Sequence, residues 1–186
     1  MEEPEYLAEV INSAKENLIK KDPIALRTLS DQTIHQATVH QDDGCITLAV
    51  LIYTLSKLIE RKDFEKIKDW DKFVKKFNSV MDLAISALRA GKEDSYKNYL
   101  SMGRKSLTSV SVNLKNYIQE VLRKASINKA SKIYEHGLSM ETTSKMLGIT
   151  LWELSEYAGQ KNIPDNPYNE TVDVKKRADM AMEFFK

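Results

Sequence analysis

Glycine and proline are scarce in this chain of 186 residues. It contains six glycines and four prolines, and no proline occurs between Pro23 and Pro164. Turns are made largely from these two residue types, and folds rich in β-sheet need many turns. The scarcity therefore favours long helices. No two glycines have the spacing of a P-loop or a dinucleotide-binding loop, which disfavours that kind of site.

Cysteine and net charge are equally sparse. The single cysteine, Cys45, excludes an internal disulfide framework and a zinc site made of clustered cysteines. The chain has 28 lysines and arginines against 27 aspartates and glutamates, a formal net charge of +1. Such a balance gives no overall field that would attract nucleic acid or an acidic membrane, so any contact with nucleic acid has to be local.

Long apolar runs are also missing. The most apolar run, residues 45–59, contains Lys57 and is shorter than the roughly 20 residues of a membrane-spanning helix. The amino-terminal sequence is acidic and lacks the apolar core of a signal peptide. These features predict a cytoplasmic protein that makes no contact with membranes.

Helical periodicity is present, first in three segments of the amino-terminal part. Residues 5–20 carry an apolar stripe at helical spacing, and Asp22 with Pro23 predicts the cap and first position of a helix that reaches about residue 40. Residues 42–44, Asp-Asp-Gly, predict a turn. Residues 45–61 are apolar on nearly all sides, which is typical of a helix at the centre of a bundle.

Two longer segments show heptad spacing. Residues 64–90 and 93–124 each carry apolar positions in alternating steps of three and four, and Gly91 between them fits a helix C-cap. They predict a long antiparallel hairpin whose seams close within one chain or join a second copy or a partner protein. Gly103 would let two backbones approach on the second seam, or is only a mild local defect. The seam positions are Ile67, Trp70, Val74, Phe77, Met81, Ala84 and Leu88, then Tyr96, Leu100, Gly103, Leu107, Val110, Leu114, Tyr117 and Val121.

The pattern changes at residue 125, where three short helices are predicted. Ser139 and Thr150 fit the caps of the second and third helices, and Gly148 falls in the turn between them. Ser144 supplies the small inner residue that a helix-turn-helix requires, and Gly148 supplies the positive φ. The sequence thus predicts an all-α protein: a helical bundle (1–124), a helix-turn-helix module (125–163), and a linker with a final helix (164–186).

This module resembles the helix-turn-helix of the UPF0175 family of small antitoxin-like or regulatory proteins. The resemblance covers residues 129–164 and does not reach residues 1–124. Thr143 and Ser144 replace the usual paired alanines, and Asn162 replaces the last glycine. The residues that carry the resemblance are Ala130, Tyr134, Gly137, Ser139, Leu147, Gly148, Ile149, Thr150, Trp152, Glu153, Ile163 and Pro164.

In a typical helix-turn-helix, the amino-terminal half of the last helix enters the major groove of DNA. Glu153 and Glu156 would then face phosphates, which is unfavourable, although glutamate can accept a hydrogen bond from cytosine N4. Residues 123–162 carry six lysines and arginines against four acids, a net charge of +2. The candidate DNA-binding residues are Ser139, Thr142, Lys145, Thr150, Trp152, Glu153, Ser155, Glu156 and Lys161.

The favoured function is therefore a non-enzymatic DNA-binding transcriptional regulator or antitoxin-like protein, with no cofactor. The alternative is a scaffold for protein contacts that uses the helix-turn-helix only for packing. A third hypothesis is a helical ribonuclease of the HEPN type, whose motif is an arginine and a histidine separated by four to six residues. Here Arg27 precedes His35 by eight positions, which departs from that motif.

Metal binding has little support in the sequence. Asp31 and His35 lie one helical turn apart, with His40 and the acids at 42 and 43 nearby, but no two histidines have the spacing of a helical ligand pair. We therefore predict no metal and no catalytic residue.

Overall fold

The computed structural model describes residues 4–40, 43–109, 115–135 and 138–160. Within these ranges the chain consists of α-helices, one short 3-10 helix and turns, without a strand, so the predicted all-helical class is confirmed. None of the helices in the described ranges combines the length and apolar character needed to cross a membrane.

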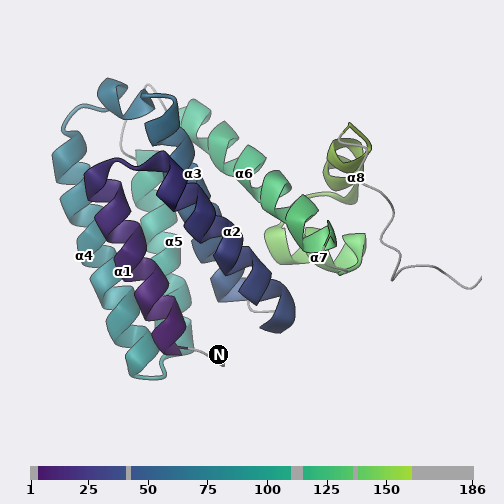
Figure 1. Ribbon diagram of the computed structural model, residues 1–186, viewed down its shortest axis with the longest axis horizontal. Coiled ribbons are helices and arrows are strands. Elements are labelled where there is room, and N and C mark those ends of the chain that lie inside the picture. The colour runs from purple at the N-terminus through teal and green to yellow at the C-terminus, as the bar shows by residue number, and fades with distance from the viewer. Residues whose placement is uncertain (1–3, 41–42, 110–114, 136–137, 161–186) are drawn as a thin grey trace, which may run out of the picture.

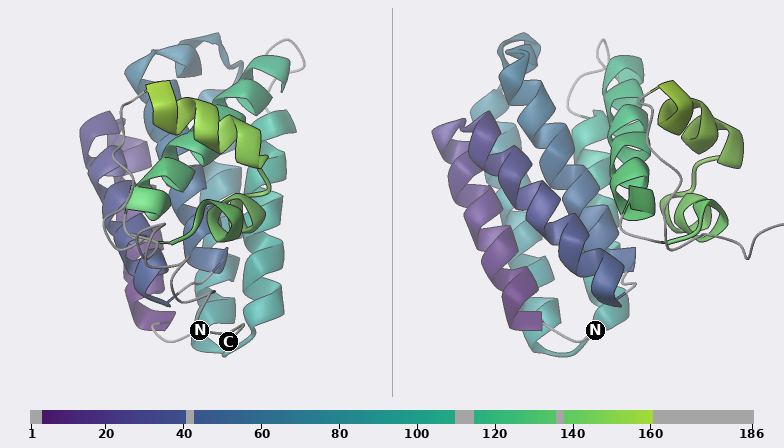
Figure 2. Two further views of the ribbon diagram at one scale, coloured as in Figure 1. Left: turned by 90° about the vertical axis from the view of Figure 1, so that its right-hand side faces the viewer. Right: turned by 45° about the vertical axis from the view of Figure 1, so that its right-hand side comes forward.

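Five helices form a bundle and three more lie beside it (Figure 1). The bundle helices pack with α3 between α2 and α5, and α6 runs along the bundle and separates it from α8 (Figures 1 and 2). The helices are α1 (Pro4–Lys20), α2 (Pro23–His40), α3 (Asp43–Glu60), the 3-10 helix η1 (Asp63–Lys66), α4 (Trp70–Arg89), α5 (Glu93–Ser109), α6 (Lys115–Glu135), α7 (Met140–Leu147) and α8 (Leu151–Gln160).

The first helices form as their sequence predicts. Asp22 caps α2, because its Oδ1 accepts hydrogen bonds from the backbone N–H groups of Ile24 at 3.0 Å and Ala25 at 2.9 Å. Helix α3 is buried on several sides by α2, α5 and α6, and Cys45 lies in the core. The predicted turn at residues 42–44 is wrong at its last two positions, since α3 already begins at Asp43 and Gly44 is buried in its first turn.

The predicted helix over residues 64–90 begins six residues late, at Trp70. Lys62 and Asp69 both adopt left-handed backbone with φ of 56° and 60°, and Ile67 between them is extended, so no continuous helix can pass. The break folds the chain back until the ring of Phe64 lies 5.6 Å from that of Trp70. Contact between these two aromatic rings stabilises the break, and helical periodicity in the sequence does not reveal such a contact.

The predicted helix over residues 93–124 is two helices in the structure. Helix α5 ends at Ser109, and α6 begins at Lys115 and continues through the expected boundary between residues 124 and 125 to Glu135. The predicted separate short helix after residue 125 is therefore wrong. The helix continues because buried residues recur at helical spacing on both sides of that boundary. These residues are Ile118, Leu122, Ala125, Lys129 and Ile133.

The heptad seams of α4 and α5 close within this chain. All seven seam positions of the first segment are buried, as are Tyr96, Leu100, Gly103 and Leu107 of α5 and Val121 of α6. Val110 and Leu114 lie outside the described residues, and the Tyr117 side chain does too. A second chain would therefore have to bind these helices through faces other than the buried seams.

Gly103 is a point of close approach between α5 and its neighbours. A Cβ atom built there would lie 2.9 Å from Met81 Cε, 3.4 Å from Phe77 Cε2 and 3.8 Å from Leu51 Cδ1. Helix α5 can thus pack closely against α4 and α3 because this position has no side chain.

Replacing Gly103 by valine should lower the free energy of unfolding by about 1–3 kcal/mol, because two additional methyl groups overfill the contact with Met81 and Phe77. Gly159→Ala is the matched control, since a Cβ there meets nothing within 4 Å. It should stabilise α8 by about 0.5–1 kcal/mol. Urea unfolding followed by circular dichroism measures both. Equal effects of the two variants would contradict the close approach.

A buried lysine fastens α6 to the bundle. The Lys129 side chain is 0% exposed, and its Nζ lies 2.7 Å from Asp31 Oδ1 on α2 and 4.2 Å from the ring centroid of Tyr53 on α3. Burial lowers the pKa of Lys129, while the hydrogen bond and the charge of Asp31 act in the opposite direction. The ammonium group therefore depends on Asp31 and Tyr53 to remain charged inside the protein.

Asp31→Asn should lower the free energy of unfolding by about 3 kcal/mol at neutral pH, because it leaves a buried cation without its carboxylate. The deficit should shrink as the pH rises toward 10.5. Where the folded pKa of a lysine lies below its unfolded value, the unfolded state binds more protons, and stability increases with pH in that interval. Urea unfolding at neutral pH and at about pH 9.5 measures both effects.

The control is the double variant Asp31→Asn/Lys129→Met, which removes the buried charge together with its partner. It should regain most of the lost stability and lose the additional rise with pH, because methionine replaces the buried cation by an apolar side chain and leaves no uncompensated charge inside the protein. A double variant as unstable as Asp31→Asn would show that the ion pair is not the cause.

Candidate functional site

Helix α7 begins and ends at residues that suit a tight two-helix unit. Ser139 Oγ accepts a hydrogen bond from the backbone N–H of Thr142 at 3.1 Å, and the Ser139 hydroxyl donates to Thr142 Oγ1 at 2.9 Å. The helix stops at Gly148, whose φ is 62°. The predicted cap and the predicted positive φ are both confirmed.

The small residues of α7 face inward, as their spacing predicts. Thr143 and Ser144 of α7 are buried, as are Leu154 and Ala158 of α8. Helices α6, α7 and α8 all pack against one another.

Helix α8 begins with a reciprocal capping box. Glu153 Oε2 accepts hydrogen bonds from the Thr150 backbone N–H at 2.9 Å and the Thr150 hydroxyl at 2.7 Å, and the Glu153 N–H donates to Thr150 Oγ1 at 3.2 Å. The cap at Thr150 is thereby confirmed.

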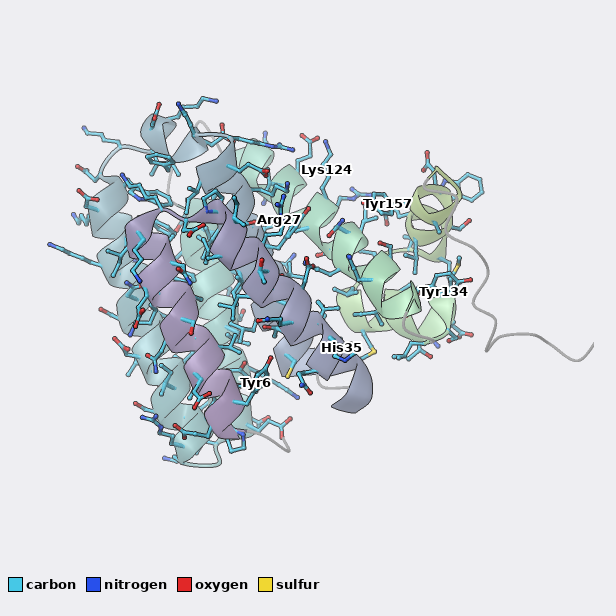
Figure 3. All side chains as sticks on the ribbon, viewed as in Figure 1. Tyr6, Arg27, His35, Lys124, Tyr134 and Tyr157 are labelled. Carbon is cyan, nitrogen blue, oxygen red and sulfur yellow. The ribbon has the colours of Figure 1, made fainter. Side chains whose placement is uncertain are left out.

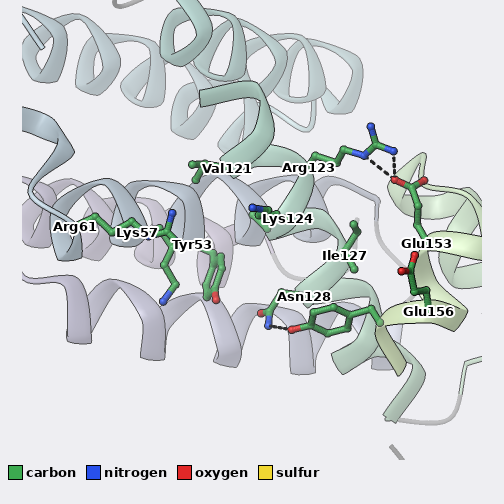
Figure 4. Close-up of a pocket in the computed structure, with 12 residues that line it drawn as sticks. Tyr53, Lys57, Arg61, Val121, Arg123, Lys124, Ile127, Asn128, Glu153 and Glu156 are labelled. Atoms are coloured by element: carbon green, nitrogen blue, oxygen red, sulfur yellow. Dashed lines mark hydrogen bonds and ion pairs between the residues drawn. The ribbon is translucent and has the colours of Figure 1, made fainter. Parts of the chain in front are cut away.

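The other oxygen of Glu153 is bound to α6. Oε1 accepts a hydrogen bond from Arg123 Nε at 2.6 Å and also forms an ion pair with the second guanidinium nitrogen of Arg123 (Figure 4). The hydrogen bonds from the Thr150 side chain and backbone, followed by those from Arg123, lower the pKa of Glu153 to about 2. We expected Glu153 to face DNA. Both of its oxygens instead hold α8 in place.

Glu153→Gln should remove an acid-sensitive part of the stability of α8. A carboxyl group whose folded pKa is about 2 and whose unfolded value is 4.5 stabilises the folded state above pH 4.5, and this contribution is lost as the pH falls toward 2. Amide-exchange protection factors of α8 should therefore decline between pH 4.5 and 2 in the wild type. In the variant they should be low already at neutral pH and change little with acid.

Glu141→Gln on α7 is the matched control. Glu141 forms an exposed ion pair with Lys145 at 2.7 Å and takes no part in the capping box. At every pH, the protection factors of α8 in this variant should equal those of the wild type. A wild-type α8 whose protection did not vary with acid would contradict the role of Glu153.

One face of α8 points into solvent. Trp152 is 77% exposed and Leu151 is 50% exposed, and Ser155 follows one turn later on the same face. Exposed tryptophan is unusual, because so large an apolar surface is normally buried or covered by a ligand or partner. Leu151, Trp152 and Ser155 are called the outer face of α8 below, whereas Glu156 lines the cavity described next.

The remaining candidate DNA-binding residues are divided by the structure. Ser139 and Thr142 lie exposed at the start of α7, and Lys145 is exposed at its end in its ion pair with Glu141. Lys161 lies outside the described residues, as do the predicted linker and final helix. Of the candidate residues that the structure describes, Lys145 is therefore the one cation.

Sequence reasoning missed a cavity between the bundle and α8. It has a volume of about 580 Å³ and lies between α3, α6 and α8 (Figure 4). No motif marks it, because its walls come from segments 100 residues apart and each contributes only a few side chains. The lining residues are Tyr53, Lys57, Arg61, Val121, Arg123, Lys124, Ala125, Ile127, Asn128, Glu153, Glu156 and Tyr157.

Charge is unevenly distributed around this cavity. Lys57 and Arg61 lie at the end formed by α3, Lys124 projects from α6, and Glu153 and Glu156 lie at the end formed by α8 (Figure 4). Lys57 Nζ lies 2.5 Å from Glu60 Oε2, and Lys124 Nζ lies 2.6 Å from Glu120 Oε1. In each pair the lysine lowers the pKa of the glutamate, chiefly through its hydrogen bond. Neither Glu60 nor Glu120 lines the cavity.

Two tyrosines add aromatic surface. Asn128 Nδ2 donates a hydrogen bond to the Tyr157 hydroxyl at 3.1 Å, which holds that ring against α6 (Figure 4). The Tyr53 ring lies 5.4 Å from Lys57 Nζ and 4.2 Å from Lys129 Nζ. The cavity thus combines flat aromatic groups, a cationic end and an acidic end.

The two residues considered for ribonuclease chemistry, Arg27 and His35, are not brought together. Arg27 and His35 lie well apart along α2 (Figure 3), about 12 Å at 1.5 Å per residue, and Arg27 Nη1 is 3.6 Å from Glu60. Asp31 is engaged by Lys129. No group of three potential ligands occurs in the part of the chain that the structure describes, and the His40 side chain and residues 41–42 lie outside it.

Comparison with protein-family models, with curated proteins and with solved structures finds no match to this chain.

Proposed function

We propose that the protein is a DNA-binding regulator in which α7 and α8 form a helix-turn-helix and the outer face of α8 enters the major groove. The observation that carries the proposal is the build of this unit. Both helices are capped by hydroxyl side chains, Gly148 has the positive φ that the turn requires, and the small residue Ser144 is buried.

The chemistry of the outer face fits contact with bases better than contact with phosphates. Leu151 and Trp152 offer apolar surface for thymine methyl groups, and Ser155 offers a hydroxyl. Glu153, the carboxylate in the first turn of α8, is neutralised by Arg123 and does not add repulsion. Phosphate contacts fall to Ser139, Thr142 and Lys145.

The proposal is tested by selecting duplexes from a random library and measuring affinity by fluorescence anisotropy. Trp152→Ala should weaken binding to the selected duplex at least tenfold, since it removes the largest surface of the outer face. Lys145→Gln should weaken all duplexes alike and reduce the slope of log K against log salt by about 1. Lys75→Gln is the matched control and should change nothing, because Lys75 is exposed on α4, a helix that packs on α1 and α5.

A folded protein that retains no duplex at about 50 mM salt would overturn the proposal. A second candidate function is then favoured by the same exposed residues. Trp is enriched at the energetic centres of protein interfaces, so Leu151 and Trp152 would serve as the anchor for a partner protein. Binding of a partner that is lost on Trp152→Ala, without any affinity for DNA, would support this candidate.

A further inference from the structure

We propose that the cavity between α3, α6 and α8 binds a nucleoside monophosphate whose base carries an amino group. Its volume of about 580 Å³ falls within the range of small-molecule sites, which is roughly 300–1,000 Å³. Like such sites, it combines apolar walls, here Val121, Ala125 and Ile127, with a small number of polar groups.

The cationic end of the cavity fits a phosphate. Lys57 and Arg61 lie at one end with Lys124 beside them. Glu60 and Glu120, the acids paired with Lys57 and Lys124, also interact electrostatically with Arg61, but neither acid lines the cavity. Arg61 offers a planar fork of N–H donors that matches two oxygens of a phosphate, and the lysines add point charges.

The opposite end fits a base with an amino group. Glu156 lines this end and accepts hydrogen bonds, and Glu153, held by Arg123, closes the wall beside it. The Tyr157 ring, held by Asn128, provides a flat surface on which a base can stack. A ligand with an anion at one end and an N–H donor at the other matches both ends of the cavity at once.

Such a ligand would link the bundle to α8, the helix that is proposed to enter the major groove. Its phosphate would contact α3 and α6 while its base would contact α8, so binding would favour one position of α8 relative to the bundle. This last step rests on the proposed DNA-binding function, whereas binding to the cavity does not.

Isothermal titration calorimetry of the full chain tests the site with AMP, IMP, CMP, UMP, adenosine and inorganic phosphate. AMP and CMP should bind with a Kd below about 1 mM. IMP and UMP, which carry a carbonyl oxygen in place of the amino group, should bind at least tenfold more weakly, as should adenosine and phosphate alone. Equal affinity of AMP and inorganic phosphate would overturn the proposal, and so would the absence of AMP binding.

Three variants assign the ends of the site. Arg61→Gln should weaken AMP at least tenfold and leave the preference for AMP over IMP unchanged. Glu156→Gln should bring the affinities of AMP and IMP to within about twofold, because the amide can donate to the carbonyl oxygen of IMP. Lys105→Gln, outside the cavity, is the control and should bind like the wild type. An unchanged preference in Glu156→Gln would overturn the assignment of the base.

The anisotropy measurement is then repeated with saturating AMP. A change of at least threefold in DNA affinity that disappears in Arg61→Gln would support the coupling to α8, and an unchanged affinity would overturn it. If no duplex binds at all, the proposed function fails, while the calorimetry still decides whether the cavity holds a nucleotide.

Discussion

The arrangement of the carboxy-terminal helices depends on one buried cation. Lys129 lies in the middle of α6 and reaches Asp31 on α2 and the ring of Tyr53 on α3, so one ammonium group connects three helices. A charge that is removed from water is stable only where its partners are held in place. Helices α7 and α8 pack on α6, and α7 also packs on α3, so this contact helps to hold them in place relative to the bundle.

A second charged contact, between α6 and α8, holds α8 in the same way. Arg123 of α6 holds Glu153 of α8, which also caps the helix through Thr150. The pair orients α8 so that Trp152 faces solvent while Tyr157 and Glu156 line the cavity. The two candidate surfaces of the protein, the outer face of α8 and the cavity behind it, therefore share one helix and one set of supports.

Much of the local structure could be predicted because it depends on neighbours in the chain. Asp22, Ser139, Thr150 and Gly148 act at the helix ends where their chemistry is needed, and the apolar seam of α4 is buried as its spacing requires. The start of α4 could not be predicted, because it depends on the contact of Phe64 with Trp70 across a break in the helix. The continuity of α6 was missed because its buried stripe includes a charged residue, Lys129, whose burial depends on Asp31, 98 positions away.

The sequence by itself determined the all-helical class, the seams and the capped pair α7 and α8, because periodicity and capping are properties of nearby residues. Only the tertiary structure decided that the seams close within one chain, that Glu153 turns toward Arg123, and that Arg61 and Glu156 line the same cavity. Each of these features depends on which side chains, distant in the sequence, come into contact in the folded protein. Spacing along the chain does not encode such contacts.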